Sequence, residues 1–170
     1  MGFPTKLKNF NVFNDGNSYM GQVSEVTLPK LTRKMEDWRG GGMGRPLKAD
    51  MGGEALQMEH VYGGIMRGIL EQYGVTTHDG VQLRFAGAYK AEDQADPVAV
   101  EVVVRGRHSE IDPGKAKAGD DTEFKVTTEV SYYKLTMDGE DVIEIDVMNM
   151  IEKVKGVDLM QKERKAMVLA

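Results

Sequence analysis

Long runs of alternating apolar and polar residues dominate the second half of the chain and predict extended strands. Residues 97–112 are rich in valine in their first half, and residues 122–137 alternate with a period of two. Both runs are longer than the ~5–6 residues usual for a strand. In the second run one face carries Phe124, Val126, Thr128, Val130 and Tyr132, and the other carries Glu123, Lys125, Thr127, Glu129 and Ser131. We expect the first face to pack inward and the second to face water.

Tight turns are marked by three Asp-Gly pairs, at residues 15–16, 79–80 and 138–139. Asp-Gly favours two-residue turns in which both residues take positive φ. Alternating or β-rich segments flank the first and third pairs, so each predicts a β-hairpin. The sequence therefore indicates a largely antiparallel sheet.

Two segments carry a helical pattern. Within residues 64–74 the apolar stripe consists of Ile65, Met66, Ile69, Leu70 and Tyr73. Near the C-terminus, Asp158 and Gln161 resemble a capping pair, and a helical turn around residues 147–154 begins a helical tail over residues 147–170. We therefore predict one domain over residues 1–170, an antiparallel β-sandwich or barrel with one packed α-helix and a helical C-terminal tail.

Residues 38–53, WRGGGMGRPLKADMGG, hold six glycines and predict a long loop between two early strands. A disordered surface loop is the simple interpretation, because ordering costs roughly 1–2 kcal/mol per residue. Contact with another subunit would offset that cost, and the loop carries side chains suited to such a contact. They are Trp38, Arg39, Met43, Arg45, Leu47 and Met51.

The chain has 170 residues, a formal net charge of −5 and no cysteine. The acidic balance argues against tight, sequence-independent binding of nucleic acid, which needs a basic surface. The lack of cysteine excludes disulfides, cysteine-based zinc sites and thiol nucleophiles. Because no apolar run approaches the ~18 residues of a membrane-spanning helix, we expect no membrane anchor.

Sequence motifs that support catalysis are absent, including the phosphate-binding loop and the nucleophile elbow. The one suggestive cluster is His108, Glu110 and Asp112, whose spacing would put all three side chains on one strand face. Three ligands on one strand rarely converge on a metal, so we predict no metal site. His60 alternates with apolar neighbours and is expected to be a hydrogen-bonded core or interface histidine. We therefore expect a protein without cofactor or enzymatic activity.

Several long segments occur in an order and spacing that mark one protein family. Residues 6–43, KLKNFNVFNDGNSYMGQVSEVTLPKLTRKMEDWRGGGM, are followed by RFAGAYK, VEVVVRGRHSEIDPG, AGDDTEFKV, SYYKLTMDGEDVIEID and NMIEKVKGVD. This series resembles the major tail tube protein of P2-like contractile-tailed phages, and the tube protein of R-type pyocins has a similar opening. The resemblance covers essentially the whole chain.

This resemblance implies a phage tail tube fold in which hexameric rings stack into a hollow tube. It implies that residues 38–53 reach into the adjacent ring as a stacking loop. The implied partners are other copies of the chain, the tail sheath protein, and the baseplate or tube-initiator, tape-measure and tail-terminator proteins, with DNA passing through without specific binding. The implied location is the virion tail, assembled in the host bacterial cytoplasm.

A closed ring also accounts for long strands with two different faces, because each strand edge would meet the next subunit. The wet face would then line the lumen, and the candidate residues are Glu101, Arg105, Glu123, Lys125 and Glu129. Alternatively, these charges lie on the outer wall, toward the sheath. Two other functions fit the sequence: a tube of an R-type pyocin-like particle or secretion system that carries no DNA, and a monomeric β-barrel that binds a small ligand.

Overall fold

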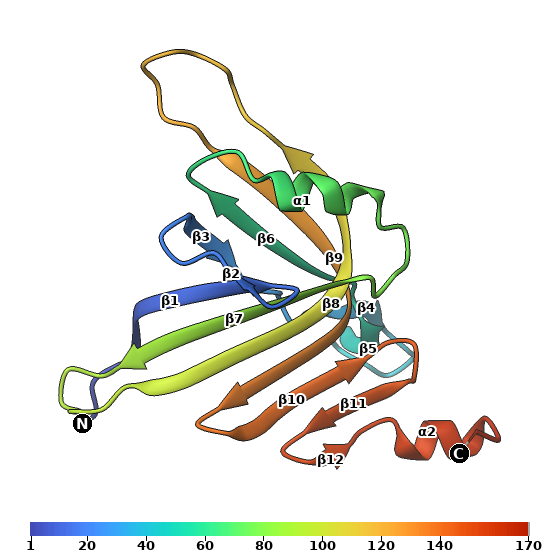
Figure 1. Cartoon of the computed structure of the whole chain (residues 1–170). Coiled ribbons are helices and arrows are strands. Elements are labelled where there is room, and N and C mark those ends of the chain that lie inside the picture. Colours follow the sequence, from blue (N-terminus) through green and yellow to red (C-terminus); the bar gives the residue numbers. More distant parts are fainter. Residues whose placement is uncertain (170) are drawn as a thin grey trace.

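The computed structural model describes residues 1–169, and most of them form antiparallel β-strands (Figure 1). The elements are β1 (Lys6–Asn14), β2 (Asn17–Ser18), β3 (Val23–Thr27), β4 (Arg33–Trp38), β5 (Leu47–Gly53), β6 (Leu56–Tyr62), α1 (Arg67–Glu71), the 3₁₀ turn η1 (Gln72–Gly74), β7 (Val81–Lys90), β8 (Val98–Asp112), β9 (Phe124–Met137), β10 (Glu140–Asp146), β11 (Ile151–Val154), β12 (Val157–Asp158) and α2 (Gln161–Ala166). The predicted mainly β, antiparallel architecture is confirmed.

One ten-stranded sheet forms the body of the molecule, and β8 and β9 are its central strands. β8 has 15 residues and β9 has 14, and the two pair along nearly their full length. The first half of β9 also pairs with β6, which carries β3, whereas the second half pairs with β10, followed by β11 and β12. On the other side of β8 lie β7, β1 and β2. The two central strands are therefore shared by two halves of one bent sheet.

The main core lies inside the bend, because side chains from both halves of the sheet pack together there. It consists of Val12, Leu56, Met58, Val81, Leu83, Phe85, Val102, Val104, Val130 and Tyr133. A smaller cluster beneath α1 consists of Tyr62, Ile69, Phe124 and Val126. Of the predicted helical stripe, Ile69 is fully buried, whereas Ile65 and Tyr73 are exposed. The helix has only five residues, so one turn of it meets the sheet.

A β-bulge between the central strands exchanges the two faces in the second half of β9, so the side chains predicted to point inward there point outward. The pairing steps by one residue on β8, from Arg105 to Gly106, but by two on β9, which leaves Ser131 as an extra residue. Tyr132 therefore lies on the outer side, with the Arg105 guanidinium carbon 4.3 Å from its ring centroid. Tyr133 takes the buried position. The prediction that Tyr132 packs inward was wrong, because an alternating pattern does not reveal an inserted residue.

The C-terminal segment differs from the helical tail predicted over residues 147–170. Strands β11 and β12 form a hairpin over residues 151–158, and α2 is confined to residues 161–166; the last residue of the range lies outside the described part. The cause is a two-residue turn at Lys155 and Gly156, whose φ angles are 53° and 77°. The predicted Asp-Gly turns at 15–16 and 138–139 also have positive φ at both residues. A Lys-Gly pair is a weaker turn signal, so the prediction missed this hairpin.

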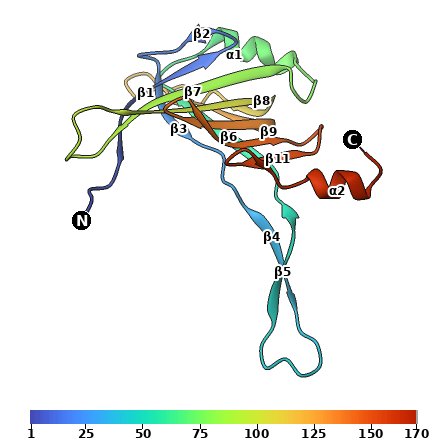
Figure 2. The same ribbon diagram turned by 90° about the horizontal axis from the view of Figure 1, so that it is seen from below.

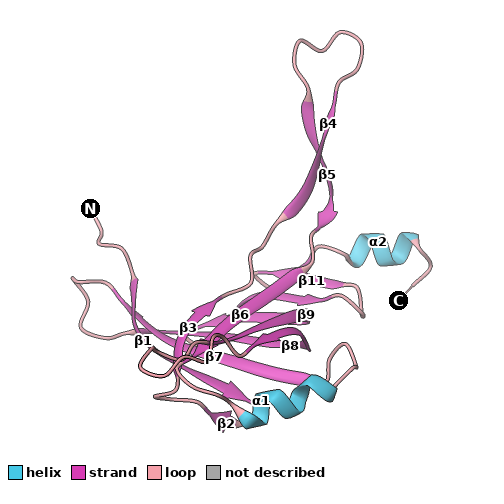
Figure 3. Cartoon of the chain, turned by 90° about the horizontal axis from the view of Figure 1, so that it is seen from above, coloured by secondary structure: helices cyan, strands magenta, loops and turns pink. Residues whose placement is uncertain are grey.

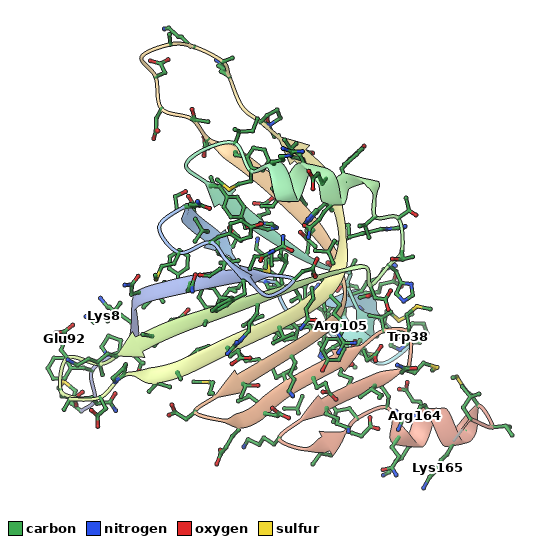
Figure 4. All side chains as sticks on the ribbon, in the orientation of Figure 1. Lys8, Trp38, Glu92, Arg105, Arg164 and Lys165 are labelled. Atoms are coloured by element: carbon green, nitrogen blue, oxygen red, sulfur yellow. The ribbon has the colours of Figure 1, made fainter. Side chains whose placement is uncertain are left out.

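Helix α2 is fastened to the preceding strands by Arg164, which Figure 4 labels. Its guanidinium binds the carboxylate of Asp158 and donates to the Met150 carbonyl at 2.6 Å. The hydrogen bond from Arg164 is the main cause that lowers the pKa of Asp158. The contact positions α2 beside β11 and β12.

Candidate assembly surfaces

The hairpin of β4 and β5 projects from the body of the molecule (Figure 2), and Figure 3 shows it as a two-stranded ribbon. Every residue of β4 and all but one of β5 are exposed. This corrects the predicted loop over residues 38–53, because Trp38 ends β4, Leu47–Gly53 form β5, and the loop proper is 39–46. Alternation in both arms pairs them as strands, and the glycines are confined to the tip and the end of β5.

One face of this hairpin carries an apolar stripe, which we define as Trp38, Leu47, Ala49 and Met51. Trp38 pairs directly with Leu47, and the other two follow at alternate positions of β5. Glu36, which pairs with Ala49, lies on the same face and forms an ion pair with Lys34 at 3.6 Å. Trp38 and Leu47 are each 62% exposed, and Met51 is 58% exposed. Figure 4 marks Trp38 on the projecting ribbon. Several large apolar side chains exposed together mark an interaction surface.

The opposite face of the hairpin carries Met35 and two ion pairs. Lys48 Nζ lies 2.9 Å from a carboxylate oxygen of Asp37, and Arg33 lies 3.0 Å from Asp50. Exposed pairs of this kind contribute about 0–1 kcal/mol each. They favour one register of the ribbon but give it no core of its own.

The tip, residues 39–46, is held by its own contacts. The amide of Gly40 donates to Met43 Sδ at 3.1 Å, and Arg39 Nε donates to the Met43 carbonyl at 3.1 Å. The Met43 amide donates back to the Gly40 carbonyl at 3.3 Å. The tip therefore has a defined shape around a half-buried Met43, with Arg39 and Arg45 exposed on its surface.

The base of the hairpin borders an apolar cavity of about 570 Å³. The cavity lies between the hairpin base and strands β9–β11, and its lining includes Leu31, Ile143 and Val147. An ion pair between Arg33 and Glu152, 3.5 Å apart, joins the hairpin to β11 beside it. The cavity is thus continuous with the surface where the hairpin leaves the sheet.

Both margins of the long sheet have strand edges that are only partly covered. Within residues 1–169, β2 pairs with β1 only at Phe13 and Asn14, although β7 pairs with β1 along its other side. At the opposite margin, β12 pairs with β11 only at Lys153 and Val154. Uncovered strand edges pair readily with other chains, so both margins are surfaces at which subunits can join.

The outer side of the sheet is polar, and we call it the open face. The ionisable residues on this side of β7–β11 are Arg84, Lys90, Glu101, Arg105, Tyr132, Lys134, Asp141, Glu144, Asp146 and Lys153. The structure brings two predicted lumen residues, Glu101 and Arg105, together here, and Figure 4 labels Arg105. Arg84 was missed, although its alternation with buried Leu83 and Phe85 is a signal that would have found it.

The other predicted lumen residues lie elsewhere. Lys125 and Glu129 are on the same side of the central strands but beyond the bulge, in the half that β6 completes. There Lys125 Nζ is 3.7 Å from Glu59, and Glu129 accepts a hydrogen bond from Gln57 at 2.9 Å. Glu123 precedes β9 and is exposed. Of the five, Glu101 and Arg105 lie on the open face, Lys125 and Glu129 lie in the half that β6 completes, and Glu123 precedes the sheet.

His108, Glu110 and Asp112 do not share a strand face. A second register shift, at Ser109, leaves His108 buried while Glu110 and Asp112 are exposed. The expectation that all three side chains lie on one face was therefore wrong. Within the described residues, no group of three or more histidine, aspartate or glutamate side chains is placed to hold a metal ion.

His60 is fully buried, as expected, and belongs to a hydrogen-bonded chain. Its Nδ1 is 2.7 Å from the Tyr62 hydroxyl, and its Nε2 is 2.9 Å from Thr128 Oγ1. The same threonine oxygen is 2.9 Å from Nδ1 of His108, whose Nε2 is 2.9 Å from Gln72 Oε1. The chain links the core strands to η1, which follows α1.

Burial lowers the pKa of His60 to about 3 and that of His108 to about 4, so both are neutral near pH 7. The direction of the hydrogen bonds follows from Asp15, whose carboxylate accepts from Gln72 Nε2 at 2.9 Å. Gln72 Oε1 then accepts from Nε2–H of His108, so Nδ1 of that ring accepts from Thr128. The threonine oxygen in turn accepts from Nε2–H of His60. Both histidines therefore have structural roles as neutral hydrogen-bonding links.

Comparison with known proteins identifies the family. The family model described as phage tail tube protein FII matches residues 4–167. The tail tube protein of Escherichia phage P2 is 49% identical over 168 residues, which are 97% of this chain and 98% of that protein. The major tail tube protein of Serratia phage KSP20 is 41% identical over 161 residues, which are 94% and 92% of the two chains. This chain belongs to the phage tail tube protein family.

The fold agrees with this family. A chain in a cryo-EM structure of an extracellular contractile injection system, the PVC sheath–tube complex in its extended state, has a TM-score of 0.59 and 9% identity, over 78% of this chain and 91% of that one. The protein is a structural subunit of the virion tail and not an enzyme. This replaces the alternative of a ligand-binding β-barrel. Within residues 1–169 no helix is long and apolar enough to cross a membrane.

Proposed function

We propose that this tail tube protein forms the inner tube of a contractile tail, as hexameric rings that stack through the β4–β5 hairpin. The observation that carries the proposal is the hairpin, an ordered ribbon whose apolar stripe faces solvent in the isolated subunit. The likeness to a chain of a sheath–tube complex supports the contractile architecture.

Burial of the apolar stripe against the adjacent ring is the stabilising contact of the stack. Fully burying a large apolar side chain contributes roughly 1.5–3 kcal/mol, and Trp38, Leu47 and Met51 are each more than half exposed in one subunit. Because every subunit of a ring presents the same hairpin, the contacts act together, and the stack is far more stable than one contact alone.

Ring closure uses the two partly covered margins of the sheet. Main-chain hydrogen bonds from β1 of one copy to β11 of the next extend the sheet around the ring, and closure leaves no edge exposed. The open face then lines the lumen, and the sheath lies on the outer wall. The tube also contacts the tube-initiator or baseplate, tape-measure and tail-terminator proteins. It is assembled in the host bacterial cytoplasm. It conducts DNA in a phage and carries none in a pyocin-like particle.

Substitution within the apolar stripe tests the stacking role. The double variant Trp38→Ser with Met51→Ser is expected to form rings but no tubes, measured by negative-stain microscopy and sedimentation of the purified full chain. The matched control is Met20→Ser, an exposed methionine in the connection from β2 to β3, which should assemble tubes like the unmodified protein. Tubes of normal length and yield from the double variant would refute stacking through the hairpin.

A further inference from the structure

The open face carries cations as well as carboxylates. The cations are Arg84, Lys90, Arg105, Lys134 and Lys153, and the carboxylates are Glu101, Asp141, Glu144 and Asp146. Exposed arginine and lysine side chains bind phosphate groups, arginine in a two-pronged geometry. A lumen wall with these cations would therefore hold DNA unless most of them were already engaged.

Arg84 is engaged by Glu101 from the neighbouring strand. Its Nη2 and Nε lie 2.9 Å from the two carboxylate oxygens, so the ion pair is a fork with two parallel hydrogen bonds. The guanidinium carbon also lies 5.2 Å from the ring centroid of Phe13 on β1. The carboxylate occupies the edge of the guanidinium that a phosphate would use.

Arg105 and Lys134 are engaged in other ways. The Arg105 guanidinium lies over the ring of Tyr132, whose hydroxyl donates to Glu144 at 2.9 Å. Burial, helped by the bond to Glu144, raises the pKa of Tyr132 to about 12, so the hydroxyl keeps the proton that it donates. Lys134 Nζ lies 3.5 Å from a carboxylate oxygen of Asp141.

We propose that these contacts mask Arg84, Arg105 and Lys134 from nucleic-acid phosphates, so that DNA moves along the open face without being held. Glu101 is the principal masking residue, because it binds Arg84 in a bidentate ion pair. The inference rests on the proposed function in one respect, the assignment of the open face to the lumen.

The test is co-sedimentation of DNA with assembled tubes of the full chain, using linear duplex DNA and a closed circular duplex that cannot thread a tube. Glu101→Gln frees Arg84 while keeping the shape of the side chain. At about 50 mM salt its tubes should retain at least about threefold more linear DNA than unmodified tubes, and the excess should be lost by about 200 mM salt. The double variant Glu101→Gln with Arg84→Gln should return to the unmodified level.

The outcomes separate the inference from the proposed function. Glu101→Gln tubes that retain no more linear DNA than unmodified tubes overturn the masking role. An increase in retention by Glu101→Gln tubes that is equal for linear and circular DNA places the open face on the outer wall and overturns the lumen assignment. Failure of the unmodified chain to form tubes counts against the proposed function alone. Should Glu101→Gln itself not assemble, Tyr132→Leu uncovers Arg105, and its tubes face the same test with the same expected result.

Discussion

Lowering the pH from 7 to 5 should destabilise the isolated subunit through its two buried histidines. In the unfolded chain both rings titrate near the ordinary pKa of 6.5, whereas burial lowers the pKa to about 3 for His60 and about 4 for His108. A proton added at Nδ1 of His108 would leave the Thr128 hydroxyl between two N–H donors. The unfolded state therefore binds more protons as the pH falls below 6.5, and the free energy of unfolding decreases.

The size of the effect follows from the pKa values. Each pH unit below 6.5 lowers the free energy of unfolding by about 1.4 kcal/mol per histidine until the folded pKa is reached. At pH 5 the loss is about 2 kcal/mol for each ring and about 4 kcal/mol for both. Since domains are stable by only about 5–15 kcal/mol, this is a large part of the total.

Urea unfolding of the monomeric full chain at pH 7 and pH 5 measures this loss. In His108→Gln the loss should fall to about 2 kcal/mol, because one buried titrating ring remains. His78→Gln is the matched control, since His78 is half exposed in the turn before β7, and its loss should equal that of the unmodified chain. An equal loss in His108→Gln and in the unmodified chain would contradict the assignment of the pH dependence to the buried histidines. Nitrogen NMR of the imidazole rings at pH 7 tests the hydrogen-bond directions. A proton on Nδ1 of either buried histidine would contradict them.

Three further substitutions test the fold. Gly106→Ala puts a Cβ 1.9 Å from the Glu129 carbonyl oxygen. Chemical denaturation should show that the free energy of unfolding falls by at least about 1–3 kcal/mol. The control Gly64→Ala, whose Cβ meets nothing within 4 Å, should leave it nearly unchanged. Leu83→Ala empties a fully buried core position and should cost about 2–5 kcal/mol in the same assay; a smaller loss would mean that the core collapses into the space. Asp158→Ala removes the carboxylate that holds α2 and should speed proteolysis at the C-terminus without shifting the main thermal transition.

The strands and the two Asp-Gly hairpins could be predicted because their signals are local. A period of two reports directly which side chains leave the strand on which side. An Asp-Gly pair between β-rich runs reports a positive-φ turn, and residues 15–16 and 138–139 have that geometry. The third hairpin turn, at Lys155 and Gly156, uses the same geometry with a residue that seldom begins such a turn, so the local signal was weaker.

The two bulges could not be predicted, because each depends on the partner strand. Nothing in the composition around Ser109 or Ser131 distinguishes an extra residue from a paired one, yet each insertion moves its neighbours to the opposite face. This is why the expected placement of Tyr132 was wrong and why His108 is separated from Glu110. Register is a property of two strands together, and a pattern read along one strand does not contain it.

The bulge at Ser131 also determines which side chains face the proposed lumen. Without the extra residue, continuing the pairing of Gly106 with Val130 would put Arg105 opposite Ser131 and turn Tyr132 into the core. The guanidinium would then lose the aromatic ring that covers it. In the observed register the ring lies on the open face, and its hydroxyl reaches Glu144 on the next strand. The insertion thus determines which cations of the open face are covered, so the charge that DNA would meet depends on strand register as much as on composition.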